Sequence, residues 1–358
     1  MTGDAMTRML ILSFILPLLG AGETPPPAEE SATEKKNEGG YVILTDSESD
    51  PEELFRRYPE IAGSWSELAR FNLLRRPGTA IEMPRELLRP DHTLAKIAGL
   101  YGEAEIQRSF DDRYIPVIQN LLLREGDVVR TWRHSGARIL FENGTYVVLR
   151  SHSKARLISL QASGSAGTPR ARLELMEGNI WSRTVGTPKG DFVIETPTAS
   201  TIIRGTDFRL KVEAGQATRL EVLEGAVELL AGDRTLLVPA HSGILSRGNG
   251  DLTGLEPLPS APSELLEPQA KQVFRASVFD GVFRWTPVGG AQSYRLEIAR
   301  DEGFFDLVEE RLTGARTSVR INGLEPGTYF WRVSALSPNG FEGPPGNGSY
   351  FVFVEKRP

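Results

Sequence analysis

The chain has 358 residues, which is enough for two or three domains joined by linkers. Its formal net charge of −6 argues against general nucleic-acid binding, because that activity needs a basic surface that displaces counterions. It contains no cysteine, and this excludes structural disulfides, thiolate metal sites and thiol catalysis.

The N-terminus has the pattern of an export signal. The apolar stretch Met9–Leu19 follows Arg8 and precedes three small residues, Gly20, Ala21 and Gly22, where cleavage fits. Residues 1–22 therefore predict a signal peptide, with export to the periplasm or cell envelope and no transmembrane domain after cleavage. An uncleaved N-terminal anchor is the alternative. The Pro-, Glu- and Lys-rich residues 23–40 predict a disordered linker.

Residues 41–90 predict a small unit of order β-α-α-β. Tyr41–Leu44 reads as a short strand, and two stretches with apolar residues at helical spacing follow it. Ala80–Met83 reads as a closing strand after the turn Pro77-Gly78.

Three pieces of this unit resemble the LysM peptidoglycan-binding family. They are Tyr41-Val42 in the first strand, Trp65 to Asn72 in the second helix, and Pro77 to Pro84 around the closing strand. The resemblance implies that an N-acetylated glycan lies between the loop after the first strand and the loop after the second helix. It places six residues in those loops: Asp46, Ser47, Asn72, Leu74, Arg75 and Gly78. A degenerate module kept for folding or protein contact is the alternative.

Residues 95–250 change to short alternating runs typical of strands, such as Tyr146–Leu149 and Phe208–Val212. They predict a β-sandwich or roll. Four dipeptides with glycine in second place separate apolar runs, and each predicts a tight hairpin turn. These are Glu125-Gly126, Asn143-Gly144, Glu177-Gly178 and Glu224-Gly225.

This region resembles the FecR domain family. The resemblance rests on Gly126 to Thr131, Ser135 to Thr145, Phe192 to Phe208 and Val222 to Val227. In its most diagnostic stretch, Thr196-Pro197 ends a strand because proline cannot donate to a β-ladder. Arg204-Gly205-Thr206 reads as a tight corner that fixes sheet geometry, with a partner contact by Arg204 as the alternative.

Residues 253–272 are rich in proline and predict a second linker, after which residues 273–356 return to an alternating β pattern. Phe283 to Leu296 and Leu324 to Val333 resemble the fibronectin type III family, which implies a second β-sandwich. Trp285 and Trp331 are expected in its core. The fold class is therefore mainly β, with one small mixed module.

The sequence offers little catalytic chemistry. Its four histidines are not at metal-ligand spacing, and it has no nucleophile elbow, P-loop or dinucleotide fingerprint. We expect no enzyme activity, cofactor or metal, and we expect peptidoglycan and envelope proteins as partners. The alternative function is a FecR-type periplasmic signalling or regulatory component coupled to a membrane partner. A cell-wall hydrolase is the third class, because paired carboxylates are recognised only in three dimensions.

Overall fold

A computed structural model describes residues 40–44, 80–84, 95–141, 144–161, 170–184, 191–203 and 205–356. Every regular element in these ranges is a β-strand, which confirms the mainly-β expectation. The part of the chain so described holds no helix able to cross a bilayer. The expected signal peptide, the linker after it and both helices of residues 41–90 lie outside the described residues.

Two strands of the expected N-terminal module are described. Strand β1 (Gly40–Leu44) pairs antiparallel with β2 (Ala80–Pro84), with Val42 opposite Glu82. The opening and closing strands are thus hydrogen-bonded neighbours although some forty residues separate them in sequence.

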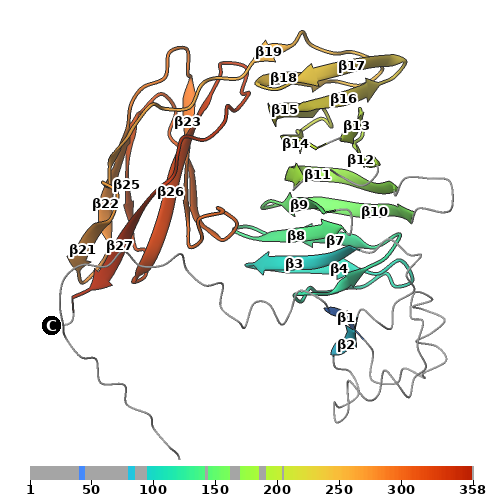
Figure 1. Ribbon diagram of the computed structural model, residues 1–358, viewed down its shortest axis with the longest axis horizontal. Coiled ribbons are helices and arrows are strands. Elements are labelled where there is room, and N and C mark those ends of the chain that lie inside the picture. The colour runs from blue at the N-terminus through green and yellow to red at the C-terminus, as the bar shows by residue number, and fades with distance from the viewer. Residues whose placement is uncertain are drawn as a thin grey trace, which may run out of the picture. The chain divides into compact units, whose positions relative to one another are not determined.

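Residues 95–258 form a two-sheet structure that we call the central sandwich (Figure 1). The strands are β3 (Ala95–Tyr101), β4 (Ala104–Gln107), β5 (Tyr114–Pro116), β6 (Leu122–Leu123), β7 (Val128–Thr131), β8 (Gly136–Phe141), β9 (Thr145–Leu149), β10 (Lys154–Gln161), β11 (Arg170–Thr184), β12 (Asp191–Glu195), β13 (Ser200–Ile203), β14 (Asp207–Val212), β15 (Thr218–Glu224), β16 (Ala226–Ala231), β17 (Arg234–Pro239), β18 (Ser242–Ser246) and β19 (Glu256–Pro257).

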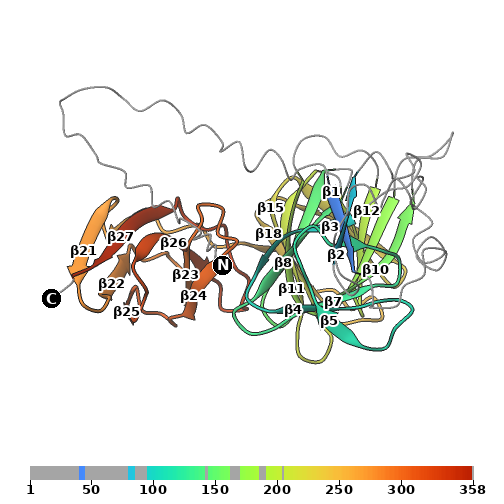
Figure 2. The same cartoon turned by 90° about the horizontal axis from the view of Figure 1, so that it is seen from below.

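The two sheets share one strand. The first sheet has the order β6-β3-β8-β9-β11-β14-β15-β18-β19, and we call it the inner sheet. The second has the order β5-β4-β7-β10-β11-β12-β13-β16-β17, and we call it the outer sheet. The N-terminal half of β11 pairs in the outer sheet, and its second half, from Gly178, pairs in the inner sheet. Figure 2 shows the two sheets on either side of the core.

Three of the four glycine dipeptides do not form the hairpin turns that the sequence predicted. Only Gly144 joins two paired strands, β8 and β9. Gly126 and Gly225 lie where the chain passes from the inner to the outer sheet, and Gly178 lies inside the continuous strand β11. The hairpin prediction is therefore wrong at these three positions. All three have positive φ, between 77° and 86°, so a glycine is needed to turn the chain from one sheet to the other.

One apolar core lies between the sheets. Fully buried side chains from the inner sheet, such as Ile139 and Leu210, pack with others from the outer sheet, such as Leu173 and Ile194. Beside this core Asp127 is buried and accepts a hydrogen bond from the buried Arg108 at 2.7 Å. It also accepts from the main-chain nitrogen of Arg124 at 2.8 Å, which explains the Gly-Asp pair of the FecR-like motif as a structural device.

Residues 265–356 form a second structure that we call the C-terminal sandwich. Its smaller sheet has the order β20-β22-β25 and its larger sheet the order β21-β27-β26-β23-β24. The strands are β20 (Leu265–Glu267), β21 (Gln272–Ala276), β22 (Asp280–Trp285), β23 (Ser293–Ala299), β24 (Leu307–Leu312), β25 (Ser318–Asn322), β26 (Gly327–Leu336) and β27 (Ser349–Glu355).

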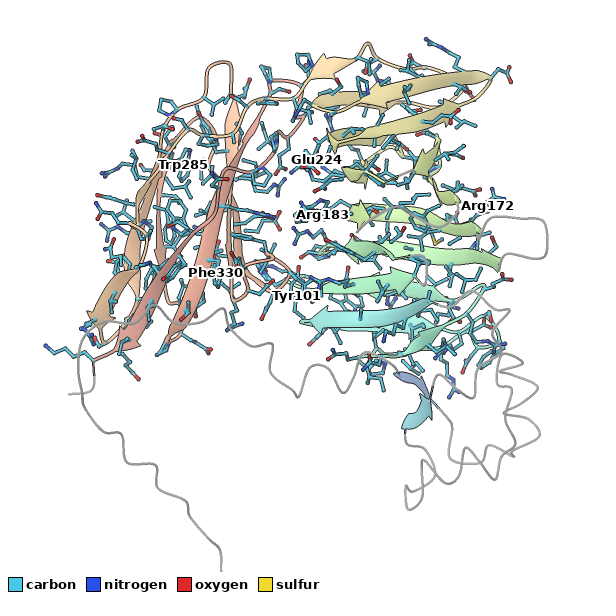
Figure 3. The ribbon with its side chains drawn as sticks, in the orientation of Figure 1. Tyr101, Arg172, Arg183, Glu224, Trp285 and Phe330 are labelled. Atoms are coloured by element: carbon cyan, nitrogen blue, oxygen red, sulfur yellow. The ribbon has the colours of Figure 1, made fainter. Side chains whose placement is uncertain are left out.

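Aromatic rings fill the core of this second sandwich. Trp285, labelled in Figure 3, and Trp331 are at most 1% exposed, which confirms their expected place. The edge of the Trp331 ring system meets Phe283 at 5.2 Å between centroids. The segment 253–272 between the sandwiches contributes to both, because β19 extends the inner sheet and β20 pairs with β22.

Candidate functional site

The residues that the sequence singled out do not converge on one place within the described structure. The six residues of the LysM-like loops, Asp46, Ser47, Asn72, Leu74, Arg75 and Gly78, all lie outside the described residues, as does Arg204. Thr196 and Pro197 precede β13, whereas Gly205 and Thr206 follow it, so the two FecR-like motifs lie at opposite ends of that strand.

These FecR-like residues hold turns together. The Thr196 hydroxyl donates to the Ala199 carbonyl at 2.7 Å and lies 2.7 Å from the Thr218 hydroxyl, so it closes the turn between β12 and β13. Gly205, with φ of 73°, begins the crossing to the inner sheet, and Thr206 is buried against Gly225. Their contacts are those of a structural corner.

A different set of residues, which the sequence did not point to, meets where the two sandwiches contact each other. We call this place the junction. On the central sandwich it comprises the outward face of β14 and β15, with Arg209, Arg219 and Glu221. On the C-terminal sandwich it comprises Glu297 of β23 and Arg332 of β26. Strand alternation puts these charges on the faces opposite the apolar cores, and Arg219, Glu221, Glu297 and Arg332 are all buried there.

Glu342, in the loop after β26, is the centre of the first charge cluster. Arg209 donates from Nη1 to its carboxylate at 2.7 Å and from Nη2 to its main-chain carbonyl at 2.6 Å. Arg295 donates from Nε to the other carboxylate oxygen at 2.8 Å. The main-chain nitrogen of Glu342 in turn donates to Glu221 at 2.6 Å. Groups from both sandwiches thus bond both carboxylate oxygens, the carbonyl and the main-chain nitrogen of Glu342.

Glu297 is the centre of the second cluster. Arg332 donates to it from Nε at 2.6 Å, and Arg150 of the central sandwich donates at 3.2 Å. The guanidinium group of Arg332 lies 4.1 Å from the centroid of Phe304 and 4.9 Å from that of Trp181. The second cluster therefore combines ion pairs with cation–π contacts from both sandwiches.

Two phenylalanines close the junction on either side of the charges. Phe305 meets Tyr101 edge-on at 5.1 Å, and a Cβ at Gly99 would lie 2.9 Å from its ring. Phe341 likewise lies where a Cβ at Gly243 would come within 2.4 Å of it. In both contacts an aromatic ring packs against bare glycine backbone. Tyr101 and Arg183 extend from the inner sheet away from the core in Figure 3.

Burial and pairing together set the ionisation of the acids. Burial opposes ionisation of Glu342, but Arg209 and Arg295 outweigh it and lower its pKa to about 2. Burial also opposes ionisation of Glu297, and Arg332 and Arg150 again lower the pKa. Burial of Glu221 opposes its ionisation more strongly than Arg209 favours it. The negative charge of Glu342 opposes it further, so the pKa of Glu221 is raised.

The junction is chemically suited to holding two domains in one orientation and to recognising charge. Within the described ranges, no group of three or more His, Asp or Glu is placed to hold a metal ion. Sequence reasoning missed these residues because an alternating charged face looks the same whether it meets water or another domain. The signal available was the run of arginine and glutamate on the polar faces of strands in both sandwiches.

Comparison with known proteins identifies one family. The FecR protein family matches residues 127–228, from the buried Asp127 to β16, so the chain carries a FecR domain as the motifs indicated. A comparison with curated proteins gives no match.

Similar solved structures include a candidate anti-sigma factor from Parabacteroides distasonis, at 16% identity and a TM-score of 0.31. That match covers 36% of this chain and 59% of the other, which is less than two thirds of its length. A segment of two fibronectin type III domains from chicken tenascin matches at 13% identity and a TM-score of 0.20, over 47% of this chain and 99% of the other.

Proposed function

We propose that this protein is a FecR-type component of the cell envelope that acts by binding other molecules and passing on that binding state, without enzymatic activity. The FecR domain at residues 127–228 is the observation that carries the proposal. The N-terminal pattern of Arg8 followed by the apolar Met9–Leu19 supports a location outside the cytoplasm.

The junction supports a signalling role of a particular kind. Arg209, Glu221, Glu297 and Glu342 each bond across or next to the contact between the sandwiches, so the C-terminal sandwich is held in a defined orientation on the FecR domain. A partner bound to one sandwich therefore affects the other through this charged contact.

Cross-linking in the native envelope tests this proposal. A photoreactive group placed at the exposed Leu237 of β17, on the outer sheet, is expected to trap one discrete envelope protein. The same group at the exposed Leu312 of β24 tests whether the C-terminal sandwich contacts a partner. Localisation of the full-length product in the cytosol, or release of muropeptides from purified sacculi by the pure protein, would contradict the proposal.

We propose further that residues 41–90 tether the protein to peptidoglycan. The antiparallel pairing of β1 with β2 supports this, because the frame of a β-α-α-β module requires its first and last strands to be neighbours. The glycan would contact the loop residues Asp46, Ser47, Asn72, Leu74, Arg75 and Gly78.

The tether is tested by sedimentation with insoluble peptidoglycan. The full chain is expected to sediment with sacculi, and Asn72→Ala is expected to weaken its retention. The matched control is Asn249→Ala, in a loop of the central sandwich. Equal retention of the two variants would assign these residues to folding or protein contact instead.

A further inference from the structure

A cavity opens at the junction of the two sandwiches. Its volume is about 480 Å³, within the ~300–1,000 Å³ typical of small-molecule sites, and domain interfaces are a preferred place for such sites. Its apolar lining includes Trp181, Leu223 and Leu336. The cavity thus combines an apolar surface with the charges of the two clusters.

The charges around the cavity do not balance. Six cations line it, namely Arg150, Arg209, Lys211, Arg219, Arg295 and Arg332. Five carboxylates line it, namely Glu213, Glu221, Glu297, Glu310 and Glu342. Six minus five leaves one positive charge when every acid is ionised, and the raised pKa of Glu221, caused by its burial, acts in the same direction. The excess of positive charge favours binding of an anion.

Three of these arginines also have unused hydrogen-bond donors. Arg332 donates only from Nε, to Glu297. Arg295 donates from Nε and Nη1, to Glu342 and Glu310. Arg219 donates from Nε and Nη1, to Glu213 and the carbonyl of Asn339. Among the described residues, nothing accepts from Nη2 of Arg219, Nη2 of Arg295 or either Nη of Arg332.

These free nitrogens are accessible. The enclosed side-chain atoms without a hydrogen-bond partner include none of them, so each of these nitrogens keeps some solvent-accessible surface. Arg332 is 9% exposed, and burial lowers the pKa of its guanidinium in spite of Glu297. It is therefore a buried cation whose charge its protein neighbours compensate incompletely.

We propose that this cavity binds a small molecule that bears an oxyanion group, such as a carboxylate, phosphate or sulfate, through free Nη groups of the arginines that line it, Arg219, Arg295 and Arg332. Planar guanidinium groups match the paired oxygens of such anions. Trp181 and the leucines nearby accept an apolar portion of the ligand. Because the cavity is lined from both sandwiches, occupancy would strengthen the contact between them.

Calorimetry on the full chain tests this assignment. Phosphate, sulfate and benzoate are titrated separately, with sodium chloride at matched ionic strength as reference and benzyl alcohol as the benzoate analogue that lacks the anion. At least one of the three anions is expected to give saturable heat, and benzyl alcohol none. Benzoate alone would identify an organic carboxylate, whereas phosphate or sulfate alone would identify an inorganic or esterified oxyanion. Saturable heat from none of them would overturn the proposal.

Variants locate the binding. Arg332→Lys keeps the charge beside Glu297 but removes the planar fork, and it is expected to weaken binding about tenfold or more. Arg219→Gln is expected to do the same, and it provides the test if Arg332→Lys alters the near-UV circular dichroism. The control is Arg320→Lys, an exposed arginine paired with Asp280 in the C-terminal sandwich. Equal affinity in the wild type and in Arg219→Gln would place the anion elsewhere.

Discussion

Arg209 of the FecR domain holds both the side chain and the main chain of Glu342, a residue 133 positions later in sequence. Because Arg209 bonds the main-chain carbonyl as well as the carboxylate of Glu342, it restrains the backbone of the loop after β26 against β14. An ion pair with the carboxylate alone would restrain only the side chain.

Loss of Arg209 should lower the unfolding free energy of the protein. Arg209→Ala leaves Glu342 and Glu221 buried with one fewer cation, and breaking a buried pair in this way costs about 3–5 kcal/mol of unfolding free energy. Urea denaturation measures it. The control, Arg320→Ala, breaks an exposed pair and is expected to cost less than about 1 kcal/mol. Similar small losses for both variants would show that the junction contributes little stability.

Acidification should loosen the junction through Glu342. Its pKa is lowered from 4.5 to about 2, so its contribution to stability is present above pH 4.5 and is lost as the pH falls toward 2. The lost contribution is about 3 kcal/mol. Glu342→Gln should therefore be less stable at neutral pH and show a flatter stability curve across this range, as measured by urea denaturation at each pH.

The contribution of Glu221 to stability should depend on pH in the opposite direction from that of Glu342. Its pKa is raised by burial, so its contribution is greatest at low pH and declines as the pH rises through the raised value. Glu221→Gln is expected to lose stability more steeply on acidification than the wild type. Parallel curves for the wild type and both glutamine variants would show that neither acid titrates with folding.

The contact between Phe341 and Gly243 should tolerate no side chain. A Cβ at Gly243 would lie 2.4 Å from the ring, so Gly243→Ala must displace Phe341, at a cost of about 1–3 kcal/mol. Thermal unfolding measures the loss. Gly254→Ala is the matched control, because a Cβ there has no atom within 4 Å, and we expect a change within about 0.5 kcal/mol. Equal melting temperatures would show that the ring does not pack against this glycine.

The FecR-like Gly-Asp motif should be structural. Asp127→Ala leaves Arg108 buried without its carboxylate partner, and we expect a loss of about 3–5 kcal/mol in urea denaturation. Asp280→Ala, which removes the partner of an exposed arginine, is the control and should change little. A loss no greater than that of the control would indicate a partner-binding role for Asp127 instead.

Alternation along the chain was sufficient to predict individual strands. Tyr146–Leu149 and Phe208–Val212 were expected as strands and lie in β9 and β14. The apolar side of each strand also identified core residues such as Trp331. Period-two patterning encodes which side of a strand avoids water, and this is a local property.

The same patterning did not reveal what covers the polar side. Glu221 and Glu297 lie on strand faces that usually meet solvent, and both are buried at the contact between the two sandwiches. Nor did the glycines reveal their role, because a positive φ at Gly178 serves a change of sheet as well as a hairpin. Both errors concern long-range pairing, to which a local pattern is insensitive.

Strand β11 gives the molecule a mechanical property. Its first half is bonded to β10 and β12, and its second half carries Trp181 to the side of Arg332. A displacement of the indole would act through the backbone of β11 on the hydrogen bonds of the outer sheet. One continuous strand therefore connects Trp181 at the junction with the hydrogen bonds of the outer sheet.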